Sequence, residues 1–261
     1  MRRSGALLLL LGLTAALARP VAAQTVAADV ARADSLLMAE QVESALGLLE
    51  ARLAAAPDDF EARWRAARAA VWLGVLATGT ELENRWYRRG VEHAARAIAA
   101  RPDDPSALQW VVAAEGSLAV QTGAGEASEL ARSVRVRAEH LLALEPDHAG
   151  AEYALAKLQY EALKLNRAKR VIARIVGRGH ELELATWDNA ARRARRAVAL
   201  DPAEPLFRIG LADILWRMGE REESVAQLEA AVALPHRVAI DKDRRGQAGL
   251  QLRHIREGRD P

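Results

Sequence analysis

Apolar residues along this chain recur at intervals of three and four positions. Two runs show the spacing: Leu48, Leu49 and Leu53, and Val225, Leu228 and Val232. It places the apolar side chains on one face of an α-helix, whereas a half-buried strand alternates apolar and polar residues. Since no segment alternates in that way, the pattern predicts an all-α fold after the first 23 residues.

A short phrase containing proline interrupts the helical runs. Its copies are Ala56-Pro57-Asp58-Asp59, Arg101-Pro102-Asp103-Asp104, Glu145-Pro146-Asp147-His148 and Asp201-Pro202-Ala203-Glu204, with a shorter form at Leu234-Pro235. A proline cannot continue the helix before it, and an acid after it can cap the next helix. Pro105 and Pro205 then open helices, where a proline costs no hydrogen bond. The recurring phrase predicts a stack of similar helical units.

Small residues keep a regular distance from these prolines. Ala45, Gly90 and Ala190 stand twelve positions before a proline, and Ala97, Ala197 and Ala230 stand five before one. In this the chain resembles the tetratricopeptide repeat (TPR) superfamily, whose units are helix pairs with small residues at the helix crossings and a closing proline. The unit 203–235 matches the family's signature at Leu211, Ala212, Leu215, Gly219, Ser224, Leu228 and Ala231, although its proline comes one residue early. The resemblance covers about residues 26–235.

The TPR resemblance implies an α-solenoid of helical hairpins that forms a right-handed superhelix, with an open hollow side and a C-terminal capping helix. The expected units are about 26–57, 58–102, 103–146, 147–202 and 203–235, followed by a cap at 236–261 that contains a helix from Asp241 to Glu257. Proline spacings beyond the standard length place insertions between paired helices, near residues 78–80, 122–125 and 164–186. Larger residues stand where the family prefers small ones: Arg52, Val134 and Leu141.

The second half of the chain also resembles the regulator of microtubule dynamics family. It shares that family's long insertion, here before Ala190, and a Leu-Pro pair after the last unit. From this resemblance we expect only the fold to carry over.

The first 23 residues have the composition of an export signal. Arg2 and Arg3 precede an apolar run from 6 to 18, and small residues end the segment before Gln24. The run is too short to span a bilayer, so we expect cleavage and a single helical domain at 24–261, periplasmic or secreted, with a retained anchor as the alternative. After cleavage 34 basic and 35 acidic residues remain, so the pI of about 9.2 does not favour nucleic acid binding.

The sequence offers little that suggests catalysis. There is no cysteine, and the six histidines never pair at the spacing of metal ligands. No nucleophile elbow, phosphate loop or dinucleotide fingerprint is present, and the paired acids at helix starts are explained by capping. We therefore predict a protein that is not an enzyme and has no cofactor or metal.

Binding residues are expected on the hollow side, which the resemblance assigns to the first helix of each pair. They are Trp64, Arg68, Trp72, Tyr153, Lys157, Tyr160, Asp213 and Trp216, with Trp64 and Trp216 as the most exposed aromatics. Flat aromatic side chains suit an extended peptide or a sugar chain. The alternative is that they fill the seams between helices. A clamp for a terminal carboxylate is not expected, since the corresponding positions include Ala113 and Asp213.

A second candidate surface is basic. It consists of Lys164, Arg167, Lys169, Arg170, Arg174 and Arg178, with Arg192, Arg193, Arg195 and Arg196 on the adjacent helix. Such a helix could rest on anionic lipid or a polyanionic wall polymer. The alternative is a solvated face neutralised by neighbouring glutamates.

The leading hypothesis is a non-catalytic exported TPR scaffold that binds a protein or peptide in its hollow, within cell-envelope assembly or maintenance. The alternative is an envelope-associated module that binds anionic lipid or glycan through Lys164–Arg178. Neither hypothesis involves nucleic acid or a transmembrane span after signal cleavage, and the oligomeric state is open.

Overall fold

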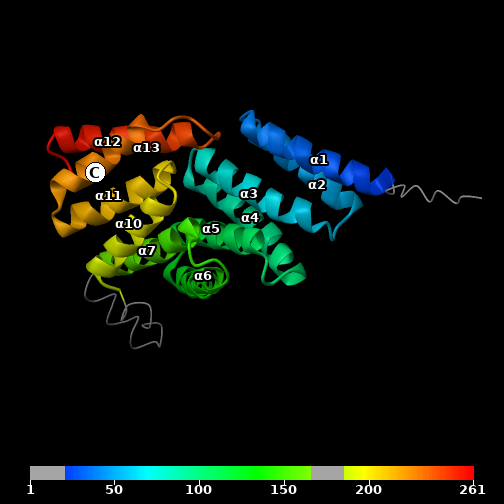
Figure 1. The fold of residues 1–261 in the computed structure, drawn as a ribbon, viewed down its shortest axis with the longest axis horizontal. Coiled ribbons are helices and arrows are strands. Elements are labelled where there is room, and N and C mark those ends of the chain that lie inside the picture. The colour runs from blue at the N-terminus through cyan, green and yellow to red at the C-terminus, as the bar shows by residue number, and fades with distance from the viewer. Residues whose placement is uncertain (1–20, 166–184) are drawn as a thin grey trace, which may run out of the picture.

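A computed structural model describes residues 21–165 and 185–261, with side chains from residue 28 onward (Figure 1). Within these ranges the chain forms eleven helices and no strand. They are α1 (Val21–Met38), α2 (Val42–Ala55), α3 (Phe60–Leu76), α4 (Thr80–Ala100), α5 (Pro105–Gln121), α6 (Ala124–Leu144), α7 (Ala149–Lys164), α10 (Trp187–Leu200), α11 (Pro205–Met218), α12 (Arg221–Ala233) and α13 (Asp241–Arg256). Most of the expected signal segment, residues 1–20, lies outside the described residues.

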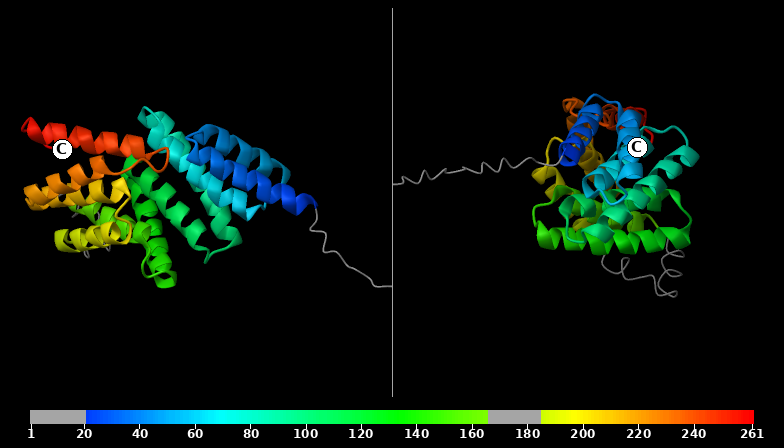
Figure 2. Two further views of the ribbon diagram at one scale, coloured as in Figure 1. Left: turned by 45° about the horizontal axis from the view of Figure 1, so that its top comes forward. Right: turned by 90° about the vertical axis from the view of Figure 1, so that its right-hand side faces the viewer.

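The helices pack in pairs, α1 with α2, α3 with α4, α5 with α6, α7 with α10, and α11 with α12. The first helix of each pair also contacts the first helix of the next, and α13 packs on α12 and α11 as the next member of that row. Figure 2 shows from two further sides how the pairs follow one another along a curved path. The prediction of an all-α solenoid is confirmed, and α13 closes its C-terminal end.

The junctions between pairs have the predicted chemistry. The side chains of Asp59 and Asp104 each accept a hydrogen bond from the backbone N–H three residues later, at 3.1 Å. Pro105 occupies the first turn of α5. His148 caps α7 in the same way at 3.2 Å, and Glu204 caps α11 by accepting from the N–H two residues later, at 3.0 Å. Each cap satisfies one N–H that the helix itself leaves unpaired.

A forked hydrogen bond from an arginine recurs at two of these junctions. Nε and Nη2 of Arg63 donate to the carbonyl oxygen of Pro57, at 3.1 and 2.7 Å. Arg208 donates in the same way to Pro202, at 3.1 and 2.9 Å. Both arginines stand six residues after the proline. The fork satisfies a carbonyl that the interrupted helix leaves without a backbone partner.

Small residues fill the helix crossings. The side chains of Ala45, Ala97, Ala190 and Ala197 are fully buried, and a Cβ at Gly90 would press on Val71 and Ala114. In the last unit Ala231 is fully buried and Ala230 is not, as expected from the early proline. The larger Val134 and Leu141 are also buried. Two of the three insertions differ from expectation, because the turns at 77–79 and 122–123 are short and the extra residues lengthen α4 and α6 to 21 residues each. Most of the third, at 164–186, lies outside the described residues.

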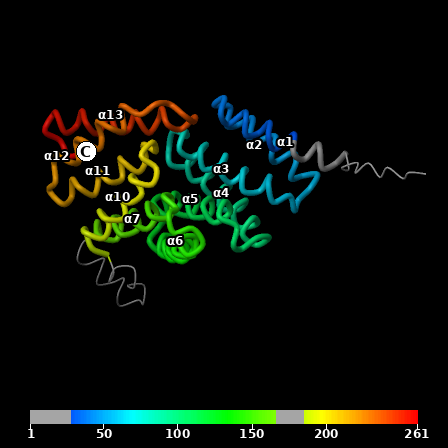
Figure 3. Tube along the Cα trace, in the orientation of Figure 1, coloured from blue at the N-terminus to red at the C-terminus, as the bar shows by residue number. Residues whose placement is uncertain are grey.

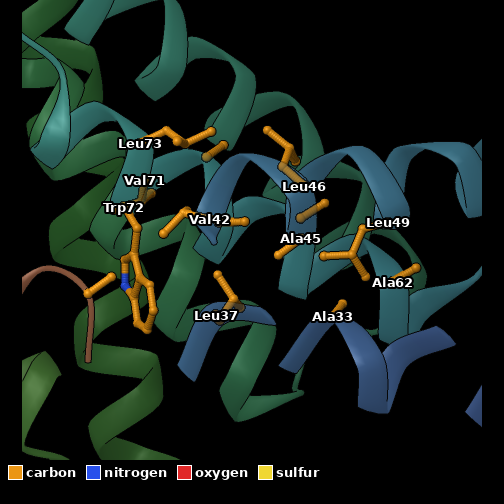
Figure 4. Packing of buried hydrophobic residues seen from close by; sticks show 14 of the residues in the cluster. Ala33, Leu37, Val42, Ala45, Leu46, Leu49, Ala62, Val71, Trp72 and Leu73 are labelled. Atoms are coloured by element: carbon orange, nitrogen blue, oxygen red, sulfur yellow. The ribbon is translucent and has the colours of Figure 1, made fainter. Parts of the chain in front are cut away.

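The segment between α12 and α13 packs against the first half of the chain. After α12 the chain returns to the first half, where Ala239 and Ile240 are buried in one apolar cluster with Leu37, Val42 and Trp72 (Figure 4). In Figures 1 and 2 this loop lies beside the end of α3. The apolar segment that precedes α13 therefore joins the last part of the solenoid to its first helices.

Candidate functional site on the hollow face

Helices α3, α7 and α11 carry the eight residues expected on the hollow face, and they belong to the inner row of first helices (Figure 3). Trp72 and Tyr160 are each only 7 % exposed. The other six are half-buried: Trp64, Arg68, Tyr153, Lys157, Asp213 and Trp216. The eight predicted residues thus lie on helices of one row. Two of their side chains, Trp72 and Tyr160, are too buried to offer a ligand a binding surface.

Three of the aromatic residues fill seams between helices. The ring of Tyr153 lies 5.0 Å from that of Phe207, and it occupies the space beside Gly210 where a Cβ would otherwise stand. Tyr160 lies 6.2 Å from Trp187 in an edge-on arrangement. Trp72 belongs to the apolar cluster of the first half. The alternative interpretation, that aromatics at helical spacing pack between helices, holds for these three side chains.

The first group of charges on this face, the Asp34 cluster, consists of Asp34, Trp64, Arg65 and Arg68. Nε of Arg65 donates to Asp34 Oδ2 at 2.9 Å, and Arg68 donates to the other carboxylate oxygen. Both guanidinium groups lie over the ring of Trp64, at 4.0 and 5.3 Å from its centre. Burial lowers the pKa of Arg68 and the charge of Asp34 opposes that shift. Asp34 ties α1 to α3 by holding both arginines.

The second group, the Glu161 cluster, consists of Lys157, Tyr160, Glu161 and Lys164. Nζ of Lys157 lies 3.0 Å from one carboxylate oxygen of Glu161, and Nζ of Lys164 lies 3.3 Å from the other. The two ammonium groups are 4.7 and 5.0 Å from the ring centre of Tyr160. Burial on its own lowers the pKa of Lys157, but nearby Tyr153 and Glu161 outweigh it and the pKa is raised.

Helices α11 and α13 complete this part of the face. Nε2 of Gln251 donates to Asp213 Oδ1 at 3.1 Å, and burial raises the pKa of Asp213 although Lys157 lowers it. Nε1 of Trp216 donates to Asp260 Oδ1 at 3.2 Å, and the guanidinium group of Arg221 lies 3.6 Å from the centre of the Trp216 ring. Trp216 is thus partly covered by the C-terminal residues.

A cavity of about 590 Å³ lies where the two ends of the described solenoid meet. Its lining residues are Glu40, Leu76, Ala239, Lys242, Asp243, Gly246, Gln247 and Leu250. Nε2 of His236 lies 3.2 Å from Glu40 and marks one edge of the contact. Leu76 and Leu250 are among the larger apolar side chains that remain exposed. The cavity joins both halves of the chain and has a mixed apolar and charged lining.

Most of the second candidate surface, residues 167–178, lies outside the described residues, and Lys164 belongs to the Glu161 cluster. On α10 the arginines are largely neutralised. Arg193 donates to Glu152, Arg195 to Glu220 and Glu223, and Arg196 to Asp147, whereas Arg192 donates to the amide oxygen of Asn189. The arginines of α10 therefore fit the alternative interpretation, in which a solvent-exposed basic face is neutralised by neighbouring acidic side chains.

Sequence analysis missed three residues that organise the hollow face: Asp34, Glu161 and Gln251. Glu161 was detectable, since it stands four residues after Lys157 and three before Lys164 on a predicted helix. Asp34 and Gln251 bond to residues 34 and 38 positions away, respectively. No local pattern reveals such pairs.

Two negative findings apply to the described part of the chain. It holds no group of three or more histidine, cysteine or acidic side chains placed to bind a metal ion. None of its helices combines the length and apolar character that crossing a bilayer requires.

Comparison with protein families decides the classification. The family described as regulator of microtubule dynamics protein 1-3 matches residues 29–255. The chain belongs to this family. The resemblance noted in the second half therefore extends over almost the whole solenoid. A comparison with curated protein sequences gives no significant match.

Solved structures share the TPR architecture at low identity. A TPR protein of Thermus thermophilus, TTC0263, is 18 % identical with a TM-score of 0.58, over 86 % of this chain and 99 % of that one. The PilF protein of Pseudomonas aeruginosa is 16 % identical with a TM-score of 0.51, over 90 % of this chain and 94 % of that one. These similarities show the fold of the chain, which is that of a TPR solenoid.

Proposed function

We propose that the protein is a non-catalytic, exported scaffold whose hollow face binds an extended segment of a protein partner, in assembly or maintenance of the cell envelope. The observation that supports binding is that three helices present half-buried aromatic and charged side chains on one face. Ion pairs within the Asp34 and Glu161 clusters hold these side chains in place before a partner arrives. Ordering them in advance lowers the entropy lost on binding.

Partner contact on the second half of the face should involve Lys157, Asp213 and Trp216. Lys157 and Asp213 carry opposite charges, and each is partly shielded from water. Lys157 already pairs with Glu161, and Asp213 already accepts from Gln251. Both groups can take a further polar partner, and a segment lacking polar groups would remove their remaining contact with water without replacing it. Selection of a polar extended segment follows from this requirement.

The test is an affinity capture from envelope extract with the mature chain and two variants. One variant combines Lys157→Ala with Trp216→Ala on the hollow face. The matched control combines Arg132→Ala with Val136→Ala on α6, where both side chains are exposed. We expect the partner to be retained by the control and lost by the hollow-face variant. Equal recovery by both folded variants, as judged by circular dichroism, would reject the hollow face as the binding surface.

Export is tested separately. Residues 1–23 fused to a reporter that is active only after export should give activity, and the secreted product should begin at Gln24. A reporter that stays inactive would reject the export part of the proposal and leave the hollow-face binding untouched.

The anionic-surface alternative gains no support from the described residues. Three of the four arginines on α10 already bond to carboxylates, so this helix offers little uncompensated charge.

A further inference from the structure

A second, smaller pocket of about 210 Å³ lies among α2, α3 and α4 and uses none of the residues expected on the hollow face. Its lining residues are Glu50, Leu53, Ala54, Arg63, Arg89, Glu92, His93 and Arg96. The volume has room for a tetrahedral ion together with a few water molecules. Three guanidinium groups converge on this space.

Arg63 is the unusual member of the set, because its side chain is covered and it lacks a counter-ion. The residue is 6 % exposed. Its bonds go to the carbonyl oxygen of Pro57 and, from Nη1, to Nδ1 of His93 at 3.3 Å. Among the described residues no carboxylate lies within 4.0 Å of its guanidinium group, in contrast to Arg89 and Arg96. These bonds use three of its five N–H groups, so two remain for a ligand.

His93 is a neutral acceptor in this arrangement. Its Nδ1 accepts from Arg63, so the proton is on Nε2, which donates to Glu50 at 3.1 Å. The residue is 2 % exposed, and burial lowers its pKa although the bond to Glu50 raises it. The imidazole therefore does not supply the missing negative charge beside Arg63.

The remaining charges of the lining leave a positive excess. Arg89 donates to Glu50 at 2.7 Å and to Glu92 at 2.8 Å, and Arg96 lies 3.0 Å from Glu92. Three arginines thus face two carboxylates, which leaves one positive charge with His93 neutral. Both Arg89 and Arg96 keep N–H groups beyond those used here.

We propose that this pocket binds one small oxyanion, phosphate or sulfate, either free or as the end group of a larger molecule. The anion would provide the counter-charge that Arg63 lacks, and the planar N–H pairs of guanidinium groups match the oxygen spacing of such anions. Glu92 also lines the pocket, and its negative charge disfavours a ligand with several acidic groups. A single compact anionic group is therefore favoured.

Arg208 provides a matched control. It makes the same fork to a proline carbonyl, and its Nη1 donates to Gln227 Oε1 at 3.0 Å. It does not line the pocket. Replacing either arginine removes one junction fork, but only Arg63→Gln removes a pocket residue. Arg96→Gln is a second pocket variant, and its exposed side chain makes unfolding a minor concern.

The experiment titrates inorganic phosphate into the mature chain by calorimetry, with sodium chloride at equal ionic strength as the reference. Wild type and Arg208→Gln should bind phosphate alike, whereas Arg63→Gln and Arg96→Gln should bind it at least about tenfold more weakly. The same titration with glycerol phosphate decides the source, since tighter binding of the ester indicates the end group of a larger molecule. No heat beyond that of chloride, or equal affinity in all four proteins, would overturn the proposal.

Discussion

The two charge clusters on the hollow face contain the same types of interaction, but one connects two helices and the other lies within a single helix. In each, one carboxylate holds two cations that lie over an aromatic ring. In the Asp34 cluster the carboxylate is on α1 and the cations are on α3, so the cluster joins two units. In the Glu161 cluster all members are on α7. The first cluster therefore contributes to the stacking of the solenoid, whereas the second arranges side chains for contact with a ligand.

The same contrast extends to the two halves as wholes. The first half carries the larger apolar cluster, to which the segment before α13 adds Ala239 and Ile240. The second half has smaller apolar clusters, and its inner helices carry the half-buried charges Lys157 and Asp213. The largest apolar cluster thus lies near α1 to α5, and the charged residues proposed for recognition lie on α7 and α11.

The largest effect is expected from breaking the contact between the halves. Ile240 is 2 % exposed, so Ile240→Ala should lower the free energy of unfolding by about 2–5 kcal/mol. Urea denaturation measures the loss, and small-angle scattering should show a larger radius of gyration as the ends separate. Leu144→Ala at the exposed end of α6 is the control and should cost less than about 0.5 kcal/mol. Equal small losses for both variants would mean that the halves fold independently of this contact.

The next effect concerns the packing at helix crossings, where a larger side chain should destabilise both halves to a similar degree. Ala45→Leu and Ala190→Leu each place a larger side chain at a fully buried crossing and should cost about 1–3 kcal/mol. Thermal unfolding measures the loss. Ala199→Leu, on the exposed side of α10, is the control. A melting temperature that falls for Ala45→Leu alone would show that the second half repacks more easily than the first.

The fold was predictable because its rules are local. A proline followed by an acid ends one helix and caps the next within four residues, and Asp59 and Asp104 act as expected. The contact of Ile240 with the first half was not predictable, since its partners are about 170 to 200 residues away along the chain. The hollow face was predicted as eight residues on three helices, of which Trp72 and Tyr160 are buried. Whether an aromatic such as Trp72 is exposed depends on which neighbour covers it, and periodicity does not reveal that.

A smaller effect separates the two charge clusters. Asp34→Asn leaves the mostly covered Arg68 without its carboxylate, whereas Arg65 keeps its ion pair with Glu61 at 2.6 Å, so a loss of about 1–2 kcal/mol is expected. Glu161→Gln breaks pairs within one helix and should cost about 0.3–0.5 kcal/mol or less. Urea denaturation at low salt measures both. A greater loss for Glu161→Gln would reverse the assignment of the Asp34 cluster to stacking.

The smallest effect is in the pH dependence of stability, where the buried groups His93 and Asp213 should contribute with opposite signs. The pKa of His93 in the first half is lowered from 6.5, so the unfolded chain takes up a proton before the folded protein does. Stability is then lost as pH falls from about 6.5 toward the lowered pKa. The pKa of Asp213 in the second half is raised from 3.8, so the folded protein takes up the proton first. Its contribution is complete below pH 3.8 and is lost as pH rises through the raised pKa.

Two variants separate the contributions of His93 and Asp213 to the free energy of unfolding, which is measured by denaturation at a series of acidic pH values. His93→Gln should flatten the loss of stability on acidification below pH 6.5, and Asp213→Asn should steepen the net loss at lower pH because an opposing contribution is gone. His148, whose pKa burial also lowers, contributes with the same sign as His93, so both variants are made in a His148→Asn background that keeps a capping side chain. If both variants changed the slope in the same direction, His93 and Asp213 would not have pKa values shifted in opposite senses with respect to stability.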